Sequence, residues 1–168
     1  MNKPLKRIIF LLLISSLPAQ LYGQRFLVFN KDKASSENIK KGDSSFFNNN
    51  FKESIGYYEQ VMANGYEENL YLNQVQNYLS DGNHDHAVQL LSLMADSGFY
   101  KFWMLEKDSV YTGLKKSGTY LPVLKKTETN FNDFVIKNHI TKPLIVQKIL
   151  WMSYLDQYYQ WQHSFKTR

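Results

Sequence analysis

The fold is decided by residues 71–124, YLNQVQNYLSDGNHDHAVQLLSLMADSGFYKFWMLEKDSVYTGLKKSGTYLPVL. Apolar residues recur in this stretch at the spacing of amphipathic helices. Gly82 and Gly98 interrupt the pattern as helix ends do, and Ser117 or Thr119 divides its last part. We interpret the stretch as a helical hairpin followed by two shorter helical turns. It predicts an all-α fold.

A similar hairpin is expected before it, from about Ala34 to Gly65. Ser35-Ser36-Glu37 supplies capping candidates for its first helix. Asn48-Asn49-Asn50 is a turn signal, because asparagine tolerates left-handed backbone. The second helix shows apolar residues at i, i+4, i+7 and i+11, namely Phe51, Ile55, Tyr58 and Met62, before Gly65 ends it.

The two hairpins match when the sequence is shifted by 33 residues. A turn residue, a small residue, bulky residues and a final glycine then coincide: Asn50 with Asn83, Ser54 with Ala87, Tyr58 with Leu91, Val61 with Met94, Gly65 with Gly98, and Tyr66 with Phe99. A constant offset across so many residue types predicts an internal repeat of helix-turn-helix units.

These residues resemble the tetratricopeptide repeats. The second unit carries Tyr71, Gln74-Val75, Tyr78, Ala87 and Leu91 at the gaps of that family's pattern, and the first unit matches less well, with Asn38, Lys41-Gly42, Ser45, Ser54 and Tyr58. The offset is one residue short of the usual 34, and glycine replaces the closing proline. The resemblance implies a helical repeat domain over residues 24–126.

The end of this domain resembles the terminal segment of many bacterial repeat proteins, from Gly98-Phe99 to Val123-Leu124. Asp108 is expected to cap a helix that begins at Ser109. Ser117 or Thr119 caps the next helix, and Pro122 favours Thr119 because proline is tolerated only in a first turn. Such a segment covers the open apolar face of the last repeat.

The C-terminal third is expected to contain a frayed helix and linker over 127–142, and a last helix over 143–168 that begins at Pro143. This last helix is apolar around most of its circumference and must bury most of it. Asp156-Gln157 also faintly resembles the opening of an uncharacterised bacterial domain. The alternative interpretation is therefore that the helix starts a truncated second domain.

Residues 1–23 have the layout of a secretory signal peptide: Lys3, Lys6 and Arg7, then a short apolar run, then small residues. The run is too short to cross a membrane. We expect cleavage before Gln24, with Gln20 as the alternative, and a periplasmic or extracellular destination.

Composition excludes several kinds of protein. The signal segment carries three positive residues, so its removal lowers the net charge from +5 to +2, and the basic residues are scattered rather than gathered on one face. Nucleic acid is therefore not the expected partner. Cysteine is absent, which excludes disulfides, thiolate metal sites and a lipid-bearing cysteine.

Catalytic and metal signals are weak. His84-Asp85-His86 suggests a metal site, but residues two apart on a helix point to different faces. No phosphate loop, serine elbow or paired-carboxylate pattern appears. We expect no enzyme activity, no metal and no cofactor. The rival hypothesis is the N-terminal module of a truncated secreted enzyme.

The favoured function is a protein-interaction module or scaffold. The repeat resemblance implies that the first helix of each unit lines a groove for a peptide or protein, through Asp43, Phe46, Leu72, Gln76 and Leu79. A second surface is expected on the aromatic last helix, at Trp151 and Tyr158, where self-association is an alternative to binding another protein.

Overall fold

The computed structural model describes residues 32–65 and 67–166, and this part is built from helices without strands. The expected all-α fold is thus confirmed for it, whereas the expected signal peptide lies outside it. Seven α-helices and one 3₁₀ helix, η1, follow in order: α2 (Lys33–Phe47), α3 (Phe51–Met62), α4 (Glu68–Ser80), α5 (His84–Asp96), α6 (Phe102–Lys107), η1 (Ser109–Lys116), α7 (Tyr120–Lys137) and α8 (Pro143–Lys166).

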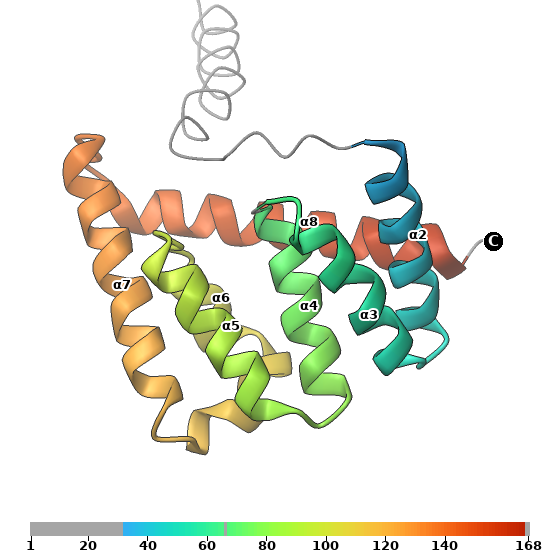
Figure 1. Ribbon diagram of the computed structural model, residues 1–168. Coiled ribbons are helices and arrows are strands. Elements are labelled where there is room, and N and C mark those ends of the chain that lie inside the picture. The colour runs from blue at the N-terminus through green and yellow to red at the C-terminus, as the bar shows by residue number, and fades with distance from the viewer. Residues whose placement is uncertain (1–31, 66, 167–168) are drawn as a thin grey trace, which may run out of the picture.

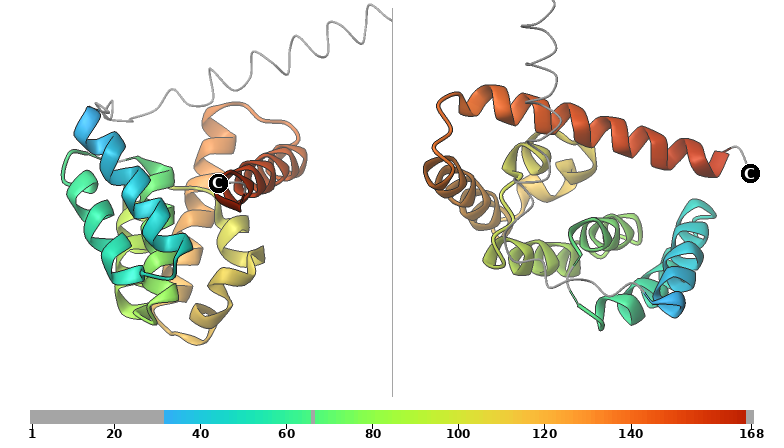
Figure 2. Two further views of the ribbon diagram at one scale, coloured as in Figure 1. Left: turned by 90° about the vertical axis from the view of Figure 1, so that its right-hand side faces the viewer. Right: turned by 90° about the horizontal axis from the view of Figure 1, so that it is seen from above.

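The helices form a curved row that the last helix crosses (Figure 1). α2 packs on α3, α3 on α4, α4 on α5, and α5 on α7. α6 and η1 pack against α7, and α8 contacts α6. Seen from above, α8 runs along one side of the molecule while the row from α7 to α2 curves along the other (Figure 2).

The first hairpin is held by a close crossing of α2 and α3 at Gly42. The Ser54 hydroxyl donates a hydrogen bond of 2.8 Å to the Gly42 carbonyl. The Tyr58 ring lies so near that a Cβ atom at position 42 would be 3.0 Å from it. Tyr58 is fully buried, and its hydroxyl donates to Asp43. A small residue is therefore needed on α2 where the helices cross.

The second hairpin reproduces several features of the first. Asn50 and Asn83 precede α3 and α5 with similar backbone angles, φ −88° and ψ 61° against φ −90° and ψ 70°. Ser54 and Ala87 are both fully buried. The glycines that follow, 65 and 98, both have positive φ, as a helix end of this kind requires. These features are compatible with a helical repeat.

The expected frayed helix and linker over 127–142 are corrected by α7, which continues unbroken to Lys137. Within this stretch the Asn130 amide donates to the Ala95 and Phe99 carbonyls at 2.7 and 2.8 Å and so satisfies the end of α5. Phe131 is buried, and Phe134 stacks on Tyr100 with centroids 4.5 Å apart. The link to α8 is therefore only residues 138–142.

Two of the four expected helix starts are confirmed in full. Asp108 caps η1 through a bond from the Val110 amide, and α8 begins at Pro143. The capping candidates Ser35-Ser36-Glu37 are wrong, because α2 begins at Lys33 and is capped by Asp32, which accepts a bond of 2.7 Å from the Ser35 amide. Thr119 directly precedes α7, but its side chain makes no capping bond there. Its hydroxyl instead lies 2.6 Å from that of Ser117.

The crossing at Gly42 gives a paired stability prediction. Gly42→Ala should lower the free energy of unfolding by about 1–2 kcal/mol, because the new methyl group meets the buried Tyr58 ring. Gly56→Ala, in a helix interior with nothing within 4 Å, should raise it by about 0.5–1 kcal/mol through helix propensity. Urea denaturation measures both. Equal effects of the two substitutions would contradict the close crossing.

Candidate interaction surface

The groove residues expected from the repeat resemblance are mostly buried. Leu72 and Gln76 are buried, Leu79 packs against the core, and η1 lies against α4. In the first unit, Asp43 is buried beneath the Tyr58 hydroxyl, and Phe46 is half-buried in edge-to-face contact with two phenylalanines. The five residues therefore do not form an open groove here, and their binding role stays a prediction.

The inner face of α8 carries the two other expected residues. Trp151 and Tyr154 pack against the main core, with Leu150 beside them. The Trp151 and Tyr154 rings stack with centroids 5.4 Å apart, and Tyr158 stacks on Tyr154 at 6.1 Å. Trp151 and Tyr158 are half-buried. Trp151 thus helps to attach α8 to its own chain, whereas Tyr158 contacts its neighbour Tyr154 on the same helix. Their role in binding a partner stays a prediction.

A polar anchor fixes α8 in this position. Asp108, which caps η1 with one carboxylate oxygen, accepts a hydrogen bond of 2.7 Å from the Tyr154 hydroxyl with the other. Close by, the Tyr120 hydroxyl donates to the Leu105 carbonyl at 2.7 Å. Bonds to a charged carboxylate are stronger than bonds between neutral groups. One carboxylate therefore links η1 and α8.

The raised pKa values of the tyrosines around Asp108 favour the same position of α8. Burial raises the pKa of the Tyr154 hydroxyl, and the nearby Tyr111 and the hydrogen-bonded Asp108 raise it further. Burial followed by the charge of Asp108 likewise raises the pKa of Tyr111 and Tyr120. These phenols remain protonated near pH 7. Tyr154 consequently keeps the proton that it donates.

The opposite face of α8 is open and apolar. Ile145 and Ile149 are each 53% exposed, Met152 is 60% exposed and Tyr159 is 65% exposed. α8 is the outermost element on its side of the molecule in both views of Figure 2. Sequence reasoning missed these four residues because the helix is apolar on both sides. The helical spacing of the sequence, which places them on the face opposite Trp151, Tyr154 and Tyr158, could have identified them.

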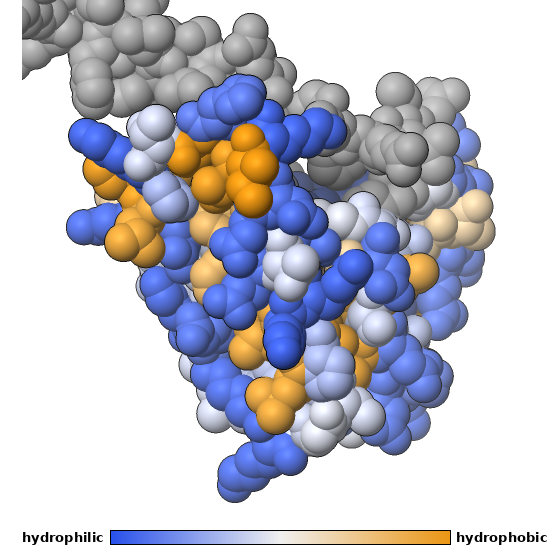
Figure 3. All heavy atoms as spheres, turned by 90° about the vertical axis from the view of Figure 1, so that its left-hand side faces the viewer, coloured by the Kyte–Doolittle hydropathy of each residue, from blue (hydrophilic) through white to orange (hydrophobic). Residues whose placement is uncertain are grey.

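Apolar residues elsewhere on the surface are more scattered. Figure 3 shows the side of the molecule that carries α7, where apolar patches are separated by polar residues. Ile136 on α7 and Leu144 at the start of α8 are exposed near the turn that joins these helices.

Sites for chemistry are not evident in the described residues. No group of three or more His, Asp or Glu side chains there is placed to hold a metal. The ring of His86 lies 2.8 Å from the Asn83 side chain and stacks on Tyr78. A depression of ≈ 400 Å³ between α5 and α7 is lined by Val88, Asp96, Thr119 and Lys126, among others. It brings together one acidic and one basic residue and no catalytic set.

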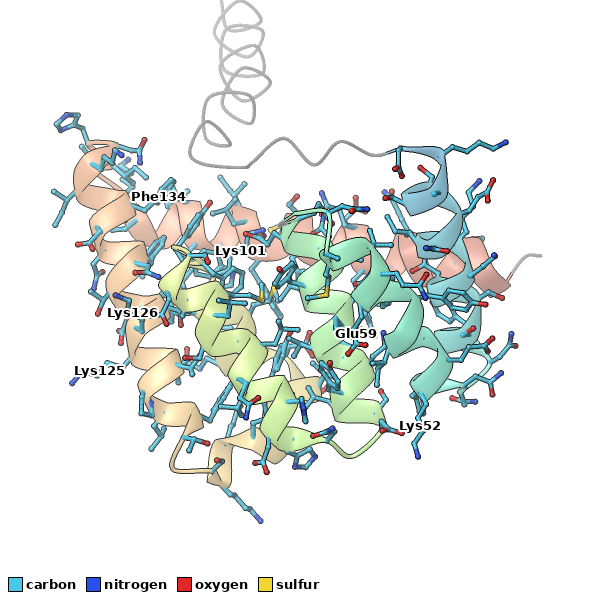
Figure 4. All side chains as sticks on the ribbon, viewed as in Figure 1. Lys52, Glu59, Lys101, Lys125, Lys126 and Phe134 are labelled. Atoms are coloured by element: carbon cyan, nitrogen blue, oxygen red, sulfur yellow. The ribbon has the colours of Figure 1, made fainter. Side chains whose placement is uncertain are left out.

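Charge is also spread out. The labelled lysines of Figure 4 lie on different parts of the row, with Lys52 on α3 and Lys125 on α7 at its opposite end. Lys101, before α6, pairs with Glu68 of α4 at 2.5 Å. No helix of the described part is long and apolar enough to cross a membrane.

The chain was compared with known protein families, with curated proteins and with solved structures. None of the three gives a match.

The anchor of α8 gives a second prediction. Tyr154→Phe should lower the free energy of unfolding by about 1–2 kcal/mol, because Asp108 loses a donor in a partly buried place. Tyr159→Phe is the matched control on the exposed face and should change it by less than about 0.5 kcal/mol. Urea denaturation at low protein concentration measures both. If the two changes were equal, the Tyr154–Asp108 bond would not anchor the helix.

Proposed function

We propose that this chain is an exported protein-interaction module, built from tetratricopeptide-like hairpins, that binds a protein through the outward face of α8. The observation that carries the proposal is the division of α8 into two apolar faces. One face is held against the core, and the other exposes Ile145, Ile149, Met152 and Tyr159. Contiguous exposed apolar residues on a folded protein favour an interaction site.

The hairpins contribute a rigid support in this proposal. Helices α2 to α5 pack in sequence, and α6, η1 and α7 extend the row to the point where α8 is attached. The 33-residue correspondence supports the tetratricopeptide-like interpretation, and the layout of residues 1–23 supports export. Burial of Leu72 and Gln76 favours α8 over the groove as the binding surface.

A photo-crosslinking experiment tests this function. A photoreactive amino acid at position 149, in cells that produce the protein, should form adducts with protein, because Ile149 lies at the centre of the exposed stripe. The same amino acid at position 52 is the matched control, since Lys52 is exposed on the distant helix α3. Adduct bands are compared on denaturing gels. Equal yields from both positions, or none from position 149, would contradict the proposal.

A further inference from the structure

We propose that the outward face of α8 binds a second copy of this chain, with the two α8 helices antiparallel about a two-fold axis at Met152. This inference rests on the proposed function, since it names the partner of the same surface. It is carried by the order of apolar and charged residues along the exposed face.

The spacing on this face is that of a helix pair. Ile145, Ile149, Met152, Asp156 and Tyr159 follow one another in alternate steps of four and three residues. Side chains at such steps form a continuous seam along which two helices pack. From Ile145 to Tyr159 the seam runs for about 21 Å at 1.5 Å per residue. A single helix of a second copy therefore fits along it.

Two pairs of residues on or beside the seam are also symmetric about Met152, whereas the seam residue Ile149 has the half-buried Leu155 as its counterpart. Ile145 and Tyr159 lie seven residues before and after it, and Lys148 and Asp156 lie four residues before and after it. In an antiparallel pair with its axis at Met152, each residue before this point faces the residue equally far after it in the second copy. Ile145 then meets Tyr159 of the second copy, and every contact occurs twice.

The charges select this orientation. In the antiparallel pair, Lys148 faces Asp156 of the second copy, so two opposite-charge pairs form. In a parallel pair, Lys148 would face Lys148 and Asp156 would face Asp156, and like charges would repel. Both side chains are exposed, and neither takes part in an ion pair within the described residues. The face is thus complementary to itself in one direction only.

The contact is small. One helix face buries less than about 1,200 Å² in total, at the low end of stable interfaces, so a weak dimer is expected. The Tyr154–Asp108 anchor keeps the required face outward before a second copy arrives. The partner therefore meets a surface that is already oriented.

Sedimentation equilibrium on the full chain tests the pairing, over micromolar to several hundred micromolar protein. The unaltered chain should dimerise. Lys148→Asp and Asp156→Lys should each raise the dissociation constant of the dimer roughly tenfold, because each substitution turns both opposite-charge pairs into like-charge pairs. An equal mixture of these two variants should dimerise again. One variant has aspartate at both 148 and 156 and the other has lysine at both, so a mixed dimer regains two opposite-charge pairs. Circular dichroism checks that both variants keep their helix content.

The register is tested with cysteines, since the chain has none. A mixture of Ile145→Cys and Tyr159→Cys should form a mixed disulfide on oxidation, whereas Ile145→Cys alone should not. A monomeric unaltered chain, a mixture of charge variants no better than either alone, or self-crosslinking of Ile145→Cys would overturn the antiparallel dimer. A monomer that still gives adducts to another protein from position 149 would overturn the dimer and leave the proposed function standing.

Discussion

The hydrogen bond from the Tyr154 hydroxyl to Asp108 decides which face of α8 is available to a partner. The helix is apolar nearly all round, so burial of apolar area alone would favour several rotations about its axis almost equally. A directional bond to a carboxylate removes that freedom, because only one rotation brings Tyr154 to Asp108. Packing of Leu150 and Trp151 against the main core supports the same rotation.

Asp108 can serve as this anchor because the preceding helices place it. Its other oxygen caps η1, and the buried Tyr120 hydroxyl holds the carbonyl of Leu105 just before it. The α6–η1 segment is in turn packed on α7 through Phe131, which contacts Phe102 and Trp103. The position of α8 thus follows from a chain of contacts that begins in the hairpins.

Local signals in the sequence were sufficient to predict the hairpins. Turn-forming asparagines and glycines, small residues at helix crossings and 3.6-residue periodicity are all local signals. The limits of α3 and α5 and the end of α4 could therefore be predicted closely. The linker over 127–142 was predicted wrongly because polar residues there act at long range: the partners of Asn130 lie 31 and 35 residues earlier in the chain. A turn-forming residue in a sequence cannot be told from one that caps a distant helix.

The candidate site was predictable only in part. The last helix was expected to bury most of its circumference, because it has too many apolar residues for one stripe. None of its residues 143–160 is buried, and Ile145, Ile149, Met152 and Tyr159 are more than half exposed. Which face turns inward depends on Asp108, 46 residues before Tyr154, and this contact could not be read from the local pattern. The groove prediction depended on the repeat resemblance, which does not include the way η1 lies against α4.

A cysteine scan along α8 tests the central claim most directly. Single cysteines placed in turn at positions 145 to 159 of this cysteine-free chain, except at the anchor Tyr154, would be reacted with a thiol reagent at low protein concentration, and their rates compared. Fast reaction is expected at positions 145, 149, 152 and 159, and slow reaction at positions 150, 151 and 158, with a helical period. Uniform rates along the helix, or fast reaction at positions 150 and 151, would contradict the anchored orientation of α8.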